Sequence, residues 1–319
     1  MAFHNVKANE PILKDNDRIA LIGNTFVERA QSFGHIEASI LVSSPAKNLM
    51  FRNLGWSGDS VFNDARSYFG PPKEGRERLG RAVSELKPTV VFICYGTGAA
   101  MSINQEWTYE KSNLTSVIGA GLEADLEVFL NGYRQLIENV KSSAGGDLRE
   151  IVLVTPPPLE NLGAPLPDQV ENNANLAAFS KAIVELANEK QIKSLDLFSA
   201  IGHSTAVADP PLTENGLHYG EAGYQMISNH WLSGIGLKPE AVSKTDFSKY
   251  SKLQNLVIEK NRLFFHRWRP ANETYLFLFR KHEQGNNAKE IPMFDPLIEE
   301  KEKEINQIRA SIQNPSKPA

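Results

Sequence analysis

Short, unbroken runs of apolar residues recur along the chain, and each predicts a β-strand. The runs are rich in β-branched and aromatic residues and are separated by polar or glycine-containing segments. They cover Arg18–Ile22, Asn48–Asn53, Thr89–Tyr95, Ile151–Thr155 and Ser194–Leu197. Because apolar positions do not alternate with polar ones, we expect strands that are buried on both faces, as in a parallel sheet.

Stretches with the apolar spacing of amphipathic helices lie between these runs. They predict helices over Phe26–Val42, Leu122–Val140 and Asn172–Lys190, and a further helix over Glu221–Leu232. Strands that alternate with helices over about 220 residues form βαβ units. We therefore expect an α/β fold, a three-layer α/β/α sandwich around a central parallel sheet.

Two proline-rich loops follow the fourth and fifth expected strands. The first contains the segment Pro156–Pro158 with Pro165 and Pro167, and the second contains Pro210 and Pro211. Ligands of open parallel sheets bind beyond the carboxyl ends of the strands. These loops are therefore expected to rim the functional site.

The character of the sequence changes after about Gly236, which divides the chain into a main domain, 1–236, and an appendage, 237–319. The appendage is expected to pack on the main domain, because it is too small and too polar to form its own core. Within it we expect a helix over Lys252–Leu263, an aromatic and basic hairpin within Phe264–His282, and a charged helix over Pro296–Ile312.

Composition narrows the classes of function. The chain has 319 residues, with 34 Lys+Arg and 38 Asp+Glu, so its net charge is −4. A charge this close to neutral argues against nucleic acid or an anionic membrane as the main partner. The only cysteine, Cys94, lies within an expected strand, which predicts a buried, unreactive thiol and excludes an internal disulfide or a cysteine-based zinc site. No apolar run reaches the roughly 18 residues of a membrane span, and the first residues do not resemble a signal peptide.

Four short motifs stand where expected strands end or a helix begins. GNTF (23–26) ends the first strand, NLGWSGDS (53–60) the second and YGTG (95–98) the third, and LTENGLHYGEAGY (212–224) precedes the last helix of the main domain. A hydroxyl after glycine at a strand-to-helix turn is exposed at the edge of the sheet. The alternative for Asn24 and Thr25 is an N-cap of the following helix.

The four motifs, in this order over about residues 17–235, resemble the SGNH or GDSL hydrolase family, with IGNT, RNLGWSG and NRLFFHRWRPANETYLFLFRKHEQGNN typical of a bacterial GDSL-like branch. The resemblance implies an ester hydrolase, acting on an acyl group of a carbohydrate without metal or organic cofactor. It places Thr25 as nucleophile, His218 as general base, and Gly55 as an N–H donor of the oxyanion hole.

The chain departs from the family pattern at three positions. Thr25 replaces serine, Gly98 stands where the family has an asparagine donor, and Asn215 stands where the family has the acid that orients the histidine. Loss of that acid favours the wrong imidazole tautomer, although Glu214 next door is a possible substitute. With the asparagine donor absent, the backbone N–H groups of Thr25 and Gly98 would complete the oxyanion hole beside Gly55. A second interpretation follows, namely a catalytically impaired protein that binds a glycan or an acylated sugar on the same fold.

Other side chains are candidates for substrate binding. Asn24, Trp56, Arg267 and Arg269 have the aromatic planes and forked donors that suit a sugar or an acidic substituent. The alternative is that the aromatics pack on the main domain while the arginines pair with carboxylates. Asp59 is a further candidate acid, with helix capping as its alternative.

The expected partner is a small-molecule or carbohydrate ester. No phosphate-binding loop follows the first strand, which disfavours a nucleotide-binding flavodoxin-like domain. The sequence does not define the oligomeric state. Family resemblance suggests export to the periplasm or the exterior, with the leader absent from this chain, but the residues themselves do not determine the compartment.

Overall fold

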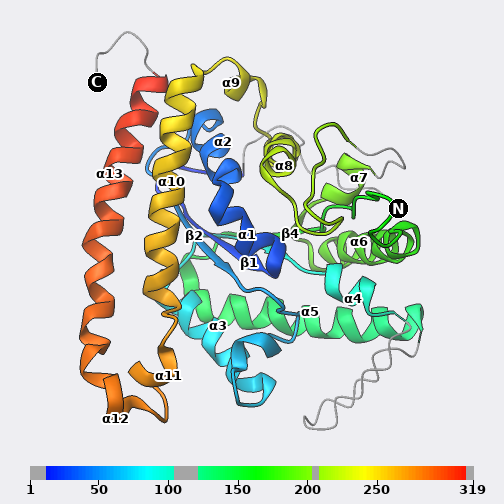
Figure 1. Cartoon of the computed structure of the whole chain (residues 1–319), viewed down its shortest axis with the longest axis horizontal. Helices are drawn as coiled ribbons and strands as arrows, with labels where there is room; N and C mark the ends of the chain where they lie inside the picture. Colours follow the sequence, from blue (N-terminus) through cyan, green and yellow to red (C-terminus); the bar gives the residue numbers. More distant parts are fainter. Residues whose placement is uncertain (1–11, 104–120, 203–207, 314–319) are drawn as a thin grey trace.

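Five parallel strands form one sheet with the order β2-β1-β3-β4-β5 (Figure 1). The structure is a computed structural model and describes residues 12–103, 121–202 and 208–313. The strands are β1 (Arg18–Gly23), β2 (Met50–Gly55), β3 (Val90–Cys94), β4 (Glu150–Val154) and β5 (Lys193–Leu195). All five expected strands are present, and the central ones are buried on both faces, which accounts for their unbroken apolar sequence.

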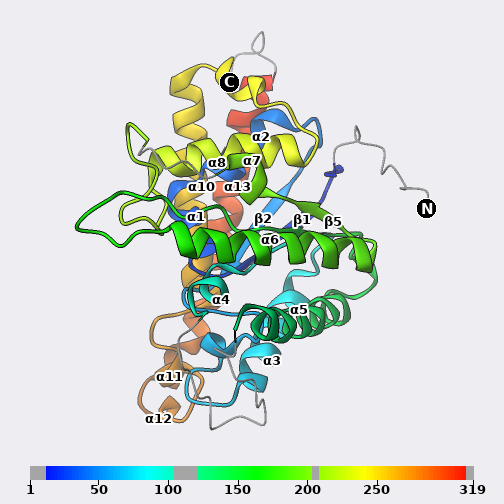
Figure 2. The same ribbon diagram turned by 90° about the vertical axis from the view of Figure 1, so that its right-hand side faces the viewer.

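Helices cover both faces of the sheet, so the expected three-layer sandwich is confirmed (Figure 2). Along β1, Ile19 and Leu21 face one hydrophobic cluster, whereas Ala20 and Ile22 face the other. One layer contains α1 (Thr25–Phe33), α2 (His35–Ser43), α8 (Glu221–Gly234) and α10 (Phe247–Trp268). The opposite layer contains α3 (Pro72–Leu86), α5 (Leu122–Ala144) and α6 (Val170–Lys190).

The helix expected over Phe26–Val42 is broken into α1 and α2 at Gly34. Gly34 has a φ of 68°, a conformation that favours glycine. A Cβ atom there would lie 3.0 Å from Ile258 Cγ1 and 3.2 Å from the carbonyl oxygen of Gln254. The break therefore lets α10 approach the turn between the two helices.

The segment 237–313 is mostly helical. Leu253, Leu256, Val257, Lys260 and Phe264 are buried along one side of α10, with helical spacing. The hairpin expected within Phe264–His282 is wrong, because this spacing continues to Trp268 and short helices follow it. The long helix α13 (Phe294–Gln313), expected from its charge pattern, packs along α10 (Figure 1).

The remaining helices are short. They are η1 (Asp64–Ser67), α4 (Thr97–Met101), η2 (Gly145–Asp147), α7 (Leu197–Ile201), α9 (Glu240–Ser243), α11 (Glu273–Leu276), α12 (Lys281–Gln284) and η3 (Gly285–Met293). α10 contacts α1, α2 and β2 and contributes side chains to the same hydrophobic core as the sheet. None of the helices described is both long and apolar enough to cross a membrane.

Candidate active site

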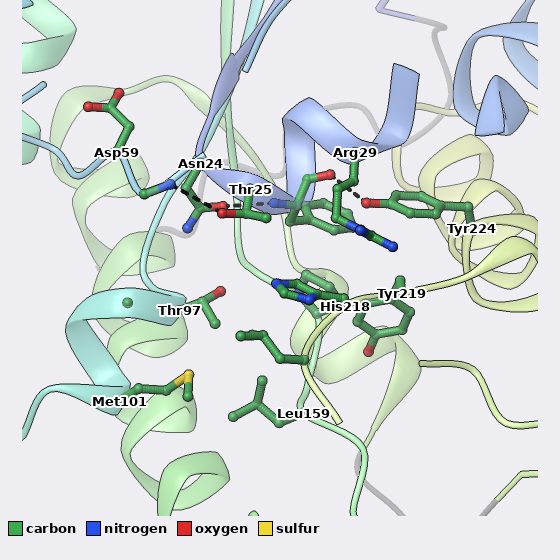
Figure 3. A pocket seen from close by; sticks show the side chains of 15 residues that line it. Asn24, Thr25, Arg29, Asp59, Thr97, Met101, Leu159, His218, Tyr219 and Tyr224 are labelled. Atoms are coloured by element: carbon green, nitrogen blue, oxygen red, sulfur yellow. Dashed lines mark hydrogen bonds between the residues drawn. The ribbon is translucent and has the colours of Figure 1, made fainter. Parts of the chain in front are cut away.

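A pocket of about 140 Å³ lies beyond the carboxyl ends of the central strands, and all four sequence motifs contribute to it (Figure 3). Its walls come from the start of α1, the turn after β2, the first turns of α4, the proline-rich loop after β4 and the loop before α8. The lining residues are Asn24, Thr25, Phe26, Arg29, Gly58, Asp59, Thr97, Gly98, Met101, Pro157, Leu159, Leu217, His218, Tyr219 and Tyr224. Thr25 and His218 therefore share one pocket.

The hydroxyl of Thr25 is free of the capping role that the sequence left open. Asn24 is the N-cap of α1, and its Oδ1 accepts a hydrogen bond from the N–H of Phe26 at 3.2 Å. Thr25 Oγ1 instead accepts a hydrogen bond from the N–H of Gly58 at 3.2 Å. Capping by Asn24 thus leaves the threonine hydroxyl at the pocket.

His218 is held by a tight loop in which Asn215 contacts its imidazole. Asn215 Nδ2 lies 3.2 Å from His218 Nδ1, while Asn215 Oδ1 accepts from the backbone N–H groups of Leu217 and His218 at 3.2 and 2.9 Å. The N–H of Glu214 donates to the carbonyl oxygen of His218 at 2.8 Å and closes the loop. Nδ1 of the imidazole is therefore engaged, and Nε2 has no hydrogen-bond partner among the described residues.

Charges at the rim act on His218. Partial burial and the nearby Arg29 guanidinium lower its pKa from 6.5, and Glu214 opposes the shift. Arg29 Nη2 pairs with Glu214 Oε1 at 2.6 Å. The Glu214 carboxylate is thus committed to Arg29. Of the two groups considered for orienting His218, it is Asn215 that contacts the imidazole ring.

Gly55 does not face the pocket. Its N–H donates to Asn53 Oδ1 at 2.8 Å, and a Cβ atom there would lie 2.3 Å from the backbone nitrogen of Glu28. Gly55 therefore allows α1 to pack closely on β2, and its expected place in an oxyanion hole is wrong. Gly58, which the sequence interpretation missed, lines the pocket in its stead. The sequence could have indicated Gly58, since NLGWSGDS contains a second glycine.

Gly98 lies in the pocket wall as the second residue of α4. The backbone N–H groups in the first turn of a helix have no acceptor within the helix. A Cβ atom at Gly98 would meet no other atom within 4 Å. The position is therefore open, and its side of the pocket has room for a bound group.

Three of the four predicted substrate-binding residues lie outside the pocket lining. The Arg269 guanidinium lies 3.7 Å from the ring centroid of the buried Trp56 and pairs with Glu28 at 2.5 Å. Arg267 pairs with Asp295 at 2.8 Å. Packing and ion pairing, the alternative considered for these residues, is what the structure contains. Asn24 does line the pocket.

The Asp59 carboxylate points away from His218 (Figure 3). Its Oδ2 accepts hydrogen bonds from Arg66 Nε and from the Tyr95 hydroxyl, both at 2.6 Å, and Arg66 is fully buried and also donates to the carbonyl oxygen of Leu54. Burial raises the pKa of Asp59, and the positive charge of Arg66 opposes that shift. Asp59 therefore anchors the turn that carries Gly58, and the structure does not support it as an acid acting on His218.

The described part of the chain offers little to bind a metal. Among residues 12–103, 121–202 and 208–313, no cluster of three His, Cys, Asp or Glu side chains could hold a metal ion. Cys94 is buried, and burial raises the pKa of its thiol. The pocket lining itself contains the hydroxyl of Thr25, the imidazole of His218 and the guanidinium of Arg29.

Known proteins are similar to this chain in sequence or in fold. The chain is 21% identical over 215 residues to the GDSL esterase/lipase WDL1 of Oryza sativa subsp. japonica, covering 65% of this chain and 73% of the relative. Its fold is similar to that of BT4096, a gut microbial diltiazem-metabolizing enzyme, with a TM-score of 0.64 at 10% identity, covering 95% of this chain and 97% of the other.

A second solved structure with a similar fold is Axe2, an acetylxylan esterase from Geobacillus stearothermophilus, with a TM-score of 0.50 at 16% identity. The similarity covers 71% of this chain and 97% of Axe2. The model of the GDSL-like Lipase/Acylhydrolase family matches residues 29–226, more than half of the chain. The chain therefore belongs to this family of carboxylic ester hydrolases.

Proposed function

We propose that the protein hydrolyses the acyl ester of a carbohydrate, with Thr25 as nucleophile and His218 as general base. One observation carries the proposal: the Thr25 hydroxyl and the His218 imidazole, from distant parts of the sequence, line the same pocket together with two glycine-bearing turns. Nucleophile, base and backbone donors grouped at the carboxyl ends of strands are the parts that acyl transfer needs.

The mechanism follows from these parts. Thr25 Oγ1 attacks the ester carbonyl carbon while its proton passes to His218 Nε2. Collapse of the tetrahedral intermediate breaks the bond to the alcohol, which leaves with the proton from His218. Water then attacks the acyl-threonine with the same base, and the acid is released. Backbone N–H groups of Thr25, Gly58 and Gly98 are the donors available to the negative oxygen.

The size of the pocket favours a short acyl group. Its volume is about 140 Å³, close to the roughly 150 Å³ of engineered cavities that bind benzene. An acetyl group fits within such a space, whereas a long fatty-acyl chain would extend beyond it. The alcohol would then remain at the open rim, near Arg29 and Glu214. The acetylxylan esterase named above, although similar only in fold, supports a sugar as this alcohol.

An ester panel tests the proposal. Acetylated xylosides and glucosides are compared with butyryl and octanoyl esters for the native protein, Thr25→Ala and His218→Ala. We expect acetyl esters to be preferred and each variant to lose about 10³-fold or more in kcat. Ser57→Ala is the matched control, because Ser57 Oγ donates to Glu28 at 2.8 Å and lies outside the pocket lining. Unchanged activity of Thr25→Ala contradicts the proposal.

The second candidate is a binding protein with little or no turnover. The contact between Asn215 and His218 favours it, because an amide does not orient an imidazole as a carboxylate does. In this case an acetylated sugar binds to the native protein and to Thr25→Ala alike, and no acid is released by either. Calorimetric titration beside the ester assay separates the two functions.

A further inference from the structure

We propose that Asn215 holds His218 as the tautomer with its proton on Nε2, so that the resting pocket is a carboxylate-binding site. The inference rests on the proposed function only for the identity of that carboxylate, which would be the acid released from the ester. The tautomer itself follows from hydrogen bonds within one loop.

The orientation of the Asn215 amide is fixed by the backbone. Its Oδ1 accepts two hydrogen bonds, from the N–H groups of Leu217 and His218. An NH₂ group placed there would face two donors, so the amide cannot be turned over without losing both bonds. Nδ2, which can only donate, therefore faces His218 Nδ1 at 3.2 Å.

The imidazole nitrogen that faces this donor, Nδ1, must accept the hydrogen bond with its lone pair. In a neutral imidazole one nitrogen donates and the other accepts, and Nδ1 is the acceptor here, so the proton lies on Nε2. Burial and Arg29 lower the pKa of His218, which favours the neutral ring. Glu214 does not draw the proton to Nδ1, because its carboxylate pairs with Arg29.

The other groups of the pocket match a negative oxygen. The Arg29 Nε atom is buried without a hydrogen-bond partner among the described residues, and its guanidinium carries positive charge beside His218. The carboxylate among the lining residues, Asp59, is turned away toward Arg66. A donor on His218 Nε2 beside the positive charge of Arg29 suits a bound carboxylate.

The same arrangement restrains catalysis. A base needs a lone pair on Nε2, which requires the proton to move to Nδ1 and to face the NH₂ group of Asn215. The tautomer able to act as base is therefore the minor one. Asn215→Asp retains an oxygen for the two backbone donors and places a second oxygen, an acceptor, at Nδ1. This variant should reverse the tautomer.

The experiment uses ¹⁵N-histidine-labelled full-length protein, with His218→Gln to assign the His218 signals. For the native protein we expect a protonated Nε2, an unprotonated Nδ1, and a shift of Nε2 on titration with acetate. In Asn215→Asp the proton should move to Nδ1, acetate affinity should fall at least ~10-fold, and turnover of an acetyl ester should rise by about 10- to 10³-fold. Glu214→Gln is the control: it should keep the native tautomer and bind acetate at least as tightly.

A protonated Nδ1 in the native protein overturns the proposal, as does equal acetate affinity in native protein and Asn215→Asp. Circular dichroism and the thermal midpoint verify that each variant is folded, and Asn215→Ser, which removes the amide donor, provides a second way to release Nδ1. Absence of ester turnover in every variant contradicts the proposed function alone, since the tautomer and the acetate affinity are measured independently of it.

Discussion

The backbone N–H of Gly58 donates a hydrogen bond to the Thr25 hydroxyl oxygen at 3.2 Å. The contact joins the turn after β2 to the first residue of α1. The turn is itself held by the buried ion pair between Asp59 and Arg66. A donor that already touches the attacking oxygen lies near the place where the oxyanion forms. The buried ion pair thus positions a group of the proposed site without touching the substrate.

Replacing Gly58 should affect activity. Gly58 has a φ of 78°, and a Cβ atom there would meet nothing within 4 Å. Alanine therefore fits in space but costs about 1–2 kcal/mol in this conformation, so the turn should rearrange. We expect Gly58→Ala to lower kcat by about 10²-fold through a displaced N–H donor. Steady-state kinetics on an acetyl ester provides the measurement, and an unchanged kcat would show that this N–H is not used.

Replacing Gly55 should affect stability instead. A Cβ atom would lie 2.3 Å from the Glu28 nitrogen and 2.6 Å from its Cα, and backbone atoms cannot move as a side chain can. We expect Gly55→Ala to reduce the free energy of unfolding by about 1–3 kcal/mol, the usual cost of overpacking. Urea denaturation measures it. A variant as stable as the native protein would mean that α1 does not pack on β2 as closely as described.

The pH dependence of activity should follow the charges around His218. The base must be neutral, so activity falls as the pH drops through its pKa. Because burial and Arg29 lower this pKa from 6.5, the acid limb of kcat/KM should lie below pH 6.5. Removing a positive neighbour raises the pKa, so Arg29→Gln should move the limb to higher pH. Removing a negative one lowers it, so Glu214→Gln should move the limb to lower pH. Shifts in the same direction for both variants would refute this assignment.

Arg269 should matter for stability and not for substrate affinity. Its guanidinium stacks on Trp56 and pairs with Glu28, away from the pocket. We expect Arg269→Ala to lower the free energy of unfolding by about 1–2 kcal/mol through loss of the cation–π contact and its packing. KM for an acetyl ester should stay unchanged. A KM raised tenfold in a stably folded variant would restore Arg269 to the substrate-binding residues.

The strands and most long helices could be predicted because burial controls their sequence. The apolar runs of β1, β3 and β4 are continuous, since both faces of a parallel sheet are covered. Helix α3 was missed, because its sequence PKEGRERLGRAVSEL is mostly polar and contains two glycines. The prediction of a hairpin was wrong for a different reason. Its aromatic residues favour β-structure by intrinsic propensity, but the buried positions of α10 have the spacing of a helix.

The site could be predicted in its positions and not in its contacts. Strand ends marked Thr25 and Gly98, the motif before the last helix of the main domain marked His218, and the structure brings all three to one pocket. The sequence did not reveal which of two glycines in NLGWSGDS turns its N–H to the pocket, since that depends on the turn conformation. Nor did it reveal that Glu214 pairs with Arg29 rather than with His218, because this choice depends on side-chain reach across the loop.

The most direct test of the account is covalent trapping of the nucleophile. An alkyl p-nitrophenyl phosphonate is incubated with the native protein, Thr25→Ala and His218→Ala, and the adduct is located by peptide mass spectrometry. We expect the Thr25 oxygen to displace p-nitrophenolate, which leaves one phosphonyl group on the peptide that contains Thr25, slowly in His218→Ala and not at all in Thr25→Ala. An adduct on another residue, or equal labelling rates in the native protein and His218→Ala, would contradict the pairing of this hydroxyl with this imidazole.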